Sequence, residues 1–177
     1  MAGWPGFMGV FSGVAEGRFA ITLNAVVSGE TPQLATSITL LLREVFDTAK
    51  DYDEAVTRLS EGTIASDCLL LVSGTREGEM CVIERTSRRS AIRHPANGLI
   101  VVTNDYRAME VETVERSELQ ATACARFDRA RAQALRHRPA TPEACFGILT
   151  DPKVKMLITV QHMVMRAATG ELHIRLP

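Results

Sequence analysis

The order of the apolar segments predicts an α+β protein in which antiparallel sheets lie between two layers of helices. Two β-like segments come first, followed by two amphipathic helices, several short strands, two further helices and a final hairpin. No β-α-β alternation runs through the chain, so a doubly wound parallel sheet is not expected. With 177 residues the chain has the length of one domain, and we expect residues 1–177 to form it.

Short apolar runs bounded by Gly, Pro and polar residues are typical of strands. They predict strands at residues 7–13, 18–27, 67–73, 79–85, 90–94, 99–102, 156–166 and 171–176. Short loops at residues 14–17, 74–78 and 168–170 join three pairs of these runs, so we expect three hairpins.

Helical spacing of apolar residues predicts helices at residues 36–49, 51–62, 112–138 and 141–149. Asp51 and Glu54 form a capping box at the start of the second helix. Thr141 and Pro142 form an N-cap with Pro in the first turn of the fourth, and Pro139 ends the third. We expect the arginines of the third helix to lie on a solvated face: Arg126, Arg129, Arg131 and Arg136.

Composition excludes several classes of function. The net charge is −1 and no long basic block is present, so no nucleic-acid partner is expected. The first ten residues have no cationic segment and contain Pro5 and Gly6, so neither a signal peptide nor a membrane span is expected. The cysteines are widely spaced and form no CxxC pair, which favours a reduced cytoplasmic protein with no metal. Nucleotide-binding glycine motifs are absent, so no cofactor is expected.

The segment GLIVVTNDY at residues 98–106 is the most informative stretch. An apolar, β-branched run ends in Thr103-Asn104-Asp105-Tyr106, so an amide and a carboxylate would stand at a strand terminus. Such groups can point into a cleft, held by the sheet behind them. An ordinary Asx turn after the strand is the alternative interpretation.

Three segments in order resemble the N-terminal-nucleophile amide hydrolases of the choloylglycine-hydrolase type. Within that superfamily the chain is most similar to N-acylethanolamine acid amidase, acid ceramidase and the isopenicillin N acyltransferases. The first segment is GWPGFMGVFSGVAEGRFAITLNAV. The second is a middle block that contains LLLREVFDTAKDYDEAVTRL and DCLLLVSGTREGEMCVIERT and ends in VVTNDY, and the third is TVQHMVMRAATGELHIRL.

This resemblance implies an αββα sandwich and hydrolysis or acyl transfer of N-acyl amides, with a small-molecule substrate. It assigns oxyanion stabilisation to Asn104 and Asn24, since a tetrahedral oxyanion needs fixed hydrogen-bond donors. A turn or strand cap is the alternative for Asn24. Substrate contacts are expected from Asp105, Tyr106, Trp4 and Phe7, although the order TNDY differs from the TNYD of relatives.

The chain also departs from these relatives. They use an N-terminal cysteine whose α-amine is the base, followed by an Arg and an Asp, whereas this sequence opens Met1-Ala2-Gly3-Trp4. We therefore expect the C-terminal portion of the fold without its nucleophile strands, and no enzymatic turnover by the chain as printed. The nucleophile segment would be encoded separately or lie upstream in a longer open reading frame, or the chain would only bind acyl ligands. A sheet edge left unpaired would also favour a homo-oligomer.

Overall fold

Five antiparallel strands form the main sheet of the structure, a computed structural model that describes residues 1, 3, 5–111 and 118–177. In spatial order these strands are β1 (Ser12–Ala15), β2 (Phe19–Asn24), β3 (Cys68–Ser73), β4 (Met80–Arg85) and β5 (Ser90–Arg93). A separate hairpin pairs β6 (His162–Arg166) with β7 (Glu171–Arg175). Every pairing between these strands is antiparallel, which confirms the predicted α+β class.

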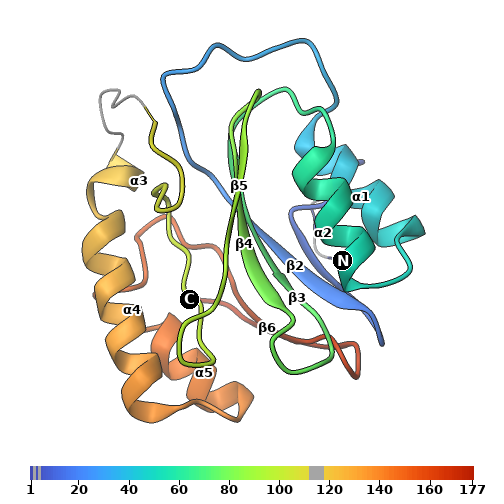
Figure 1. Ribbon diagram of the computed structural model, residues 1–177. Coiled ribbons are helices and arrows are strands. Elements are labelled where there is room, and N and C mark those ends of the chain that lie inside the picture. The colour runs from blue at the N-terminus through green and yellow to red at the C-terminus, as the bar shows by residue number, and fades with distance from the viewer. Residues whose placement is uncertain (2, 4, 112–117) are drawn as a thin grey trace.

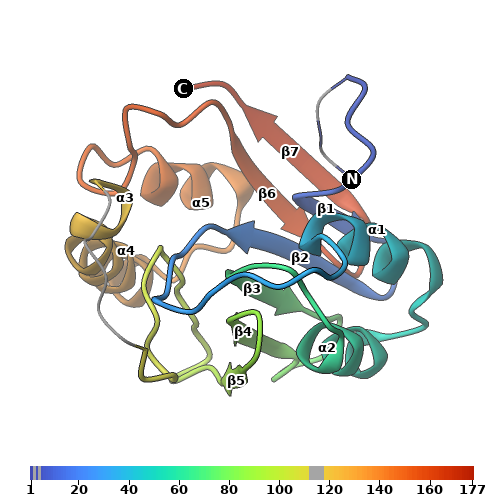
Figure 2. The ribbon, with the colours of Figure 1, turned by 90° about the horizontal axis from the view of Figure 1, so that it is seen from above.

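Helices cover both sides of the sheet (Figures 1 and 2). On one side lie α1 (Ile38–Thr48) and α2 (Tyr52–Glu61), and on the other lie α4 (Ala123–His137) and α5 (Pro142–Leu149). A short helix, α3 (Glu118–Ala121), precedes α4. The β6–β7 hairpin lies on the α4–α5 side and meets the end of the sheet, where Gly17 N–H donates to the Ala167 carbonyl at 2.9 Å.

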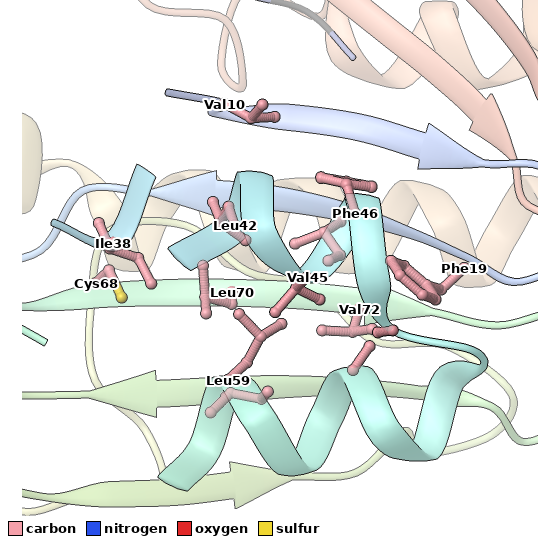
Figure 3. Packing of buried hydrophobic residues seen from close by; sticks show 14 of the residues in the cluster. Val10, Phe19, Ile38, Leu42, Val45, Phe46, Leu59, Cys68, Leu70 and Val72 are labelled. Carbon is pink, nitrogen blue, oxygen red and sulfur yellow. The ribbon is translucent and has the colours of Figure 1, made fainter. Parts of the chain in front are cut away.

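Alternation along the strands gives the sheet two different faces. Phe19 and Ile21 of β2, together with Leu70 and Val72 of β3, point toward α1 and α2 and belong to the main hydrophobic core (Figure 3). The intervening residues of the same strands point to the opposite side. The first face is therefore a packed core, whereas the second is available for a site.

Two predicted helix starts, at Asp51 and Thr141, agree with the structure, whereas the helix predicted from residue 36 begins at Ile38. Asp51 accepts a hydrogen bond from Glu54 N–H at 2.9 Å, and Glu54 accepts one from Lys50 N–H at 2.9 Å, which completes the capping box. Thr141 accepts from Ala144 N–H at 3.2 Å, with Pro142 in the first turn of α5. The predicted helix at 112–138 is observed as α3 and α4, and its first residues, 112–117, lie outside the described part of the chain.

The predicted strand at 99–102 is wrong. Asn97 and Gly98 both have positive φ, 57° and 69°, in a tight turn closed by two hydrogen bonds between Ala96 and Leu99. Beyond this bridge residues 100–103 leave the sheet. The Val101 carbonyl accepts from the Arg93 guanidinium at 2.7 Å instead of from a neighbouring strand.

The last predicted hairpin is shorter than expected at its start. The strand begins at His162, and residues 156–159 form a turn in which Thr159 N–H donates to the Met156 carbonyl at 3.1 Å. The side chain of Thr159 in turn accepts from Met156 N–H at 3.2 Å. A turn that satisfies its own backbone groups competes with extension of the strand.

Candidate functional site

An apolar cavity of about 510 Å³ lies on the second face of the sheet. Its floor is formed by β2 and β3, one wall by residues 99–103, and the others by α4, α5 and β6. Representative lining residues are Thr22, Leu71, Ile100, Ala130, Ile148 and Met163. Few polar side chains enter this lining, and Asn24, Thr103 and Arg126 are among them. A largely apolar cavity with a few placed polar groups is the usual form of a small-molecule site.

Asn104 is buried beside this cavity and is held by both ends of its side-chain amide. Its Nδ2 donates to the Ala25 carbonyl at 2.7 Å, and its Oδ1 accepts from the Arg126 guanidinium at 2.8 Å. The preceding Thr103 hydroxyl donates to the Ala123 carbonyl in the first turn of α4 at 3.1 Å. These contacts fix the orientation of the amide, because its donor and acceptor ends each have a matching partner.

Arg126 does not follow the expectation of a solvated arginine face. Its exposed fraction is only 9%, its Nε donates to the Thr122 hydroxyl at 3.1 Å, and burial lowers the pKa of its guanidinium. Arg129, one turn along the helix, is more exposed and pairs with Asp151 at 2.6 Å. The spacing of the arginines in this helix does not predict the difference, because Asn104, which contacts Arg126, lies 22 positions away in the sequence.

Asn24 stands at the end of β2, half-buried, with its backbone paired to Leu69. It lines the cavity from the sheet side, whereas Arg126 lines it from α4. Asn104 contacts Arg126 directly. The structure thus places one predicted oxyanion donor, Asn24, in the cavity lining and the other, Asn104, beside it in contact with Arg126, a buried cation that the sequence did not single out.

The neighbours of Asn104 make other contacts. Asp105 accepts a hydrogen bond from the Cys124 thiol at 3.1 Å. The Tyr106 hydroxyl donates to the Arg85 carbonyl at 2.8 Å, and burial raises the pKa of this phenol. Tyr106 packs against a small apolar cluster with Val26 and Leu69 and is not among the residues that line the cavity within the described chain.

The N-terminal aromatic residues lie apart from the cavity or outside the described chain. Phe7 is 40% exposed and stacks on Phe11 with ring centroids 5.0 Å apart. The following residues run along α1, where Val10 N–H donates to the Thr39 carbonyl at 2.9 Å. Trp4 lies outside the described residues.

Three of the four cysteines have thiols whose pKa is raised by burial. Burial raises the pKa of Cys68 to about 12, and it also raises those of Cys81 and Cys145. Cys124 is exposed and donates a hydrogen bond to the Asp105 carboxylate. All four cysteines lie in the described part of the chain and are free thiols. A nucleophilic cysteine needs the opposite environment, with cationic neighbours and a lowered pKa.

The described residues contain no candidate metal centre and no membrane-spanning helix. Among them, no cluster of three or more His, Cys, Asp or Glu side chains is arranged to hold a metal ion. Within the same residues no helix combines the length and hydropathy needed to cross a membrane. The register of the β6–β7 hairpin places His162 opposite Arg175 and His173 opposite Val164, so the two histidines are not a directly facing pair.

Solved structures include a close match in fold. The Caenorhabditis elegans ortholog of N-acylethanolamine-hydrolyzing acid amidase superposes with a TM-score of 0.67 at 21% sequence identity. The match covers 90% of this chain and 70% of that one. At this identity the likeness shows the fold alone, and it confirms the α+β N-terminal-nucleophile hydrolase architecture inferred from the resemblance.

Two curated relatives are acid ceramidases. That of Balaenoptera acutorostrata scammoni is 30% identical over 95 residues, covering 48% of this chain and 24% of the relative. That of Heterocephalus glaber is 28% identical over 98 residues, covering 49% of this chain and 25% of the relative. The matched part therefore spans about a quarter of each ceramidase.

The family model for acyl-coenzyme A:6-aminopenicillanic acid acyl-transferase matches residues 5–174, which is nearly the whole chain. This match contains Asn24, Asn104 and residues 99–103, which form one wall of the cavity. It agrees with the fold and with the acid ceramidase similarity, all within the N-terminal-nucleophile superfamily. The chain belongs to the acyl-coenzyme A:6-aminopenicillanic acid acyl-transferase family.

Proposed function

We propose that this chain binds N-acyl amides and supplies the acyl pocket and oxyanion donors for C–N hydrolysis or acyl transfer. The observation that carries the proposal is the apolar cavity with Asn24, Thr103 and Arg126 among its lining and Asn104 beside it. The apolar walls suit an acyl chain, and the polar residues suit the amide group. The similarity to an amidase in fold and to an acyltransferase family in sequence supports the same reaction class.

The chemistry follows from the geometry around Asn104. When a nucleophile attacks an amide carbonyl, negative charge develops on the oxygen, and fixed N–H donors stabilise it. The amide nitrogen of Asn104 carries two protons, and its bond to the Ala25 carbonyl uses one. In the proposal the second proton faces the developing oxyanion. The Arg126 guanidinium donates to the oxygen of this amide, which prevents a 180° flip that would exchange its oxygen and nitrogen.

Acyl-ligand binding without turnover is the second candidate. The raised thiol pKa values of Cys68, Cys81 and Cys145 favour it, since thiols that stay protonated near neutral pH are poor nucleophiles. Under the first candidate, a separate segment or a second copy of the chain supplies the attacking group. A reducing, cytoplasmic location is part of the proposal, supported by the four free thiols.

A combined binding and turnover experiment separates these candidates. Purified chain is titrated with an N-acylethanolamine, a short N-acyl amino acid and a bile-salt conjugate, and release of each amine is followed. Binding with turnover supports the first candidate, hydrolysis or acyl transfer. Asn104→Ala is then expected to lower kcat by about 10²–10³-fold, the usual cost of one oxyanion donor.

Two controls complete this experiment. Cys68→Ala should leave turnover unchanged, because that thiol is buried and its pKa is about 12. Binding without turnover that weakens in Asn104→Ala is expected for the second candidate, and for the first candidate only when its nucleophile comes from a separate segment. Failure of all three amides to bind would contradict both.

A further inference from the structure

Glu84 is a fully buried carboxylate for which the proposed reaction has no direct use. It lies in β4 with an exposed fraction of 0%, and the alternation of that strand points it to the same face as Val82, away from α1 and α2. A buried carboxylate is costly unless hydrogen bonds or a cation satisfy it. Its partners therefore indicate what it holds in place.

Three consecutive backbone N–H groups converge on this carboxylate. Arg107 N–H lies 3.0 Å from both oxygens, and the N–H groups of Ala108 and Met109 donate to Oε2 at 2.9 and 3.1 Å. Successive backbone donors of this kind form a concave anion site. Here the anion is supplied by the chain itself, so the loop after Tyr106 is fastened to β4.

Arg93 extends the same attachment to the other side of the asparagine. Its Nε lies 3.6 Å from Glu84 Oε1, and its guanidinium donates to the Val101 carbonyl at 2.7 Å. Asn104 lies between these two attachment points. A pair of side chains on adjacent strands, β4 and β5, thus holds both ends of the segment that carries it.

We propose that Glu84 is a positioning residue that, with Arg93, fixes residues 101–109 so that the Asn104 amide is aimed at the acyl carbonyl. This inference rests on the proposed function. Glu84 touches no substrate in the proposal and acts through the backbone of the loop. Small displacements of a group in a binding or catalytic constellation have large effects on affinity and rate.

Glu79 provides a matched control elsewhere in the fold. Its carboxylate also accepts hydrogen bonds from backbone N–H groups, those of Thr75 and Arg76, each at 2.9 Å. It holds the β3–β4 hairpin loop and is not among the described residues that line the cavity. Glu79→Gln and Glu84→Gln therefore remove the same kind of interaction, one from a remote loop and one from the loop that carries Asn104.

The test uses NMR spectra of the ¹⁵N-labelled full chain. The side-chain amide signals of Asn104 are assigned by their loss in Asn104→Ala. In Glu84→Gln we expect those signals to shift and hydrogen exchange at residues 107–109 to accelerate by about 10-fold or more, because a glutamine cannot accept from all three N–H groups. Glu79→Gln should lower stability without moving the Asn104 signals.

Affinity for the N-acylethanolamine is the second readout. We expect Glu84→Gln to weaken it by about 10- to 100-fold, whereas Glu79→Gln leaves it unchanged. Asn104 signals that stay in place in Glu84→Gln would overturn the proposal and leave Glu84 with a purely structural role. If Glu84→Gln does not fold, Glu84→Asp, which keeps the charge on a shorter side chain, is read by the same criteria. If the wild-type chain binds no amide, the proposed function fails, while the Asn104 signals still decide the role of Glu84.

Discussion

The two faces of the five-stranded sheet are built by different means. Toward α1 and α2, side chains such as Leu42, Leu59 and Leu70 are completely buried in one continuous apolar core (Figure 3). Toward α4 and α5, the same strands face a cavity, and hydrogen bonds of Glu84 and Asn104 hold the covering segment. The same sheet thus serves as a core on one side and as the floor of a site on the other.

This difference shows how the fold separates stability from function. A close-packed apolar face supplies most of the free energy of folding and leaves no room for a ligand. The opposite face is less densely packed and leaves a cavity, and directed hydrogen bonds keep residues 101–109 in one conformation. Variants that change one face at a time therefore test the comparison directly.

The largest expected effect comes from two neighbouring leucines of β3. Leu70 is fully buried in the packed core, whereas Leu71 is half-buried and lines the cavity. Leu70→Ala should lower the free energy of unfolding by about 3 kcal/mol or more, and Leu71→Ala by about 1 kcal/mol. Urea unfolding of both variants measures this. Equal losses would mean that the two faces contribute alike.

The next largest effect on the free energy of unfolding is expected for Asn104→Ala. Asn104→Ala removes the partner of the Ala25 carbonyl and of the Arg126 guanidinium, so we expect a loss of about 1–3 kcal/mol in unfolding free energy. Asn24→Ala is the control, since within the described residues its half-buried side chain makes no hydrogen bond, and it should cost less than about 0.5 kcal/mol. A reversed order in denaturant unfolding would contradict this view of the cavity edge.

Filling the cavity should affect binding more than stability. Ala130 lines the cavity from α4, whereas Ala132 is exposed on the same helix. Ala130→Leu is expected to weaken N-acyl amide binding by about 10-fold or more, with a change in unfolding free energy below about 1 kcal/mol. Ala132→Leu should leave the titration unchanged. Unaltered affinity in Ala130→Leu would place the ligand elsewhere.

The smallest expected effect concerns pH and the hairpin beside the cavity. Burial, with further contributions from Lys155 and Arg175, lowers the pKa of His162 below its ordinary value of 6.5. The unfolded chain then binds this proton more readily, so the stabilisation is present above pH 6.5 and is lost as the pH falls toward the lower folded pKa.

Thermal melts between pH 7 and pH 5 measure this effect. The melting temperature of the wild-type chain should fall more over that range than that of His162→Gln. His173 is exposed on β7, so His173→Gln should behave like the wild type. Equal pH dependence of the wild type and His162→Gln would refute the assignment.

Local features of the sequence were sufficient to predict much of the secondary structure. The capping box of Asp51 and Glu54 and the N-cap at Thr141 involve residues three positions apart, so their hydrogen bonds could be predicted without the rest of the chain. The ordered resemblance of three segments was enough to indicate the family, which the match over residues 5–174 confirms.

Only the tertiary structure decided how the cavity edge is made. The apolar run at 99–102 has the composition of a strand. The Val101 carbonyl nevertheless accepts a hydrogen bond from the Arg93 side chain, and the run forms a wall of the cavity. Arg126 belongs to an arginine-rich helix whose other members gave no reason to single it out. Its burial depends on Asn104, which in turn bonds Ala25, 79 positions earlier. Periodicity reports the neighbours of a residue along its own helix or strand, whereas these contacts exist only after distant segments have packed together.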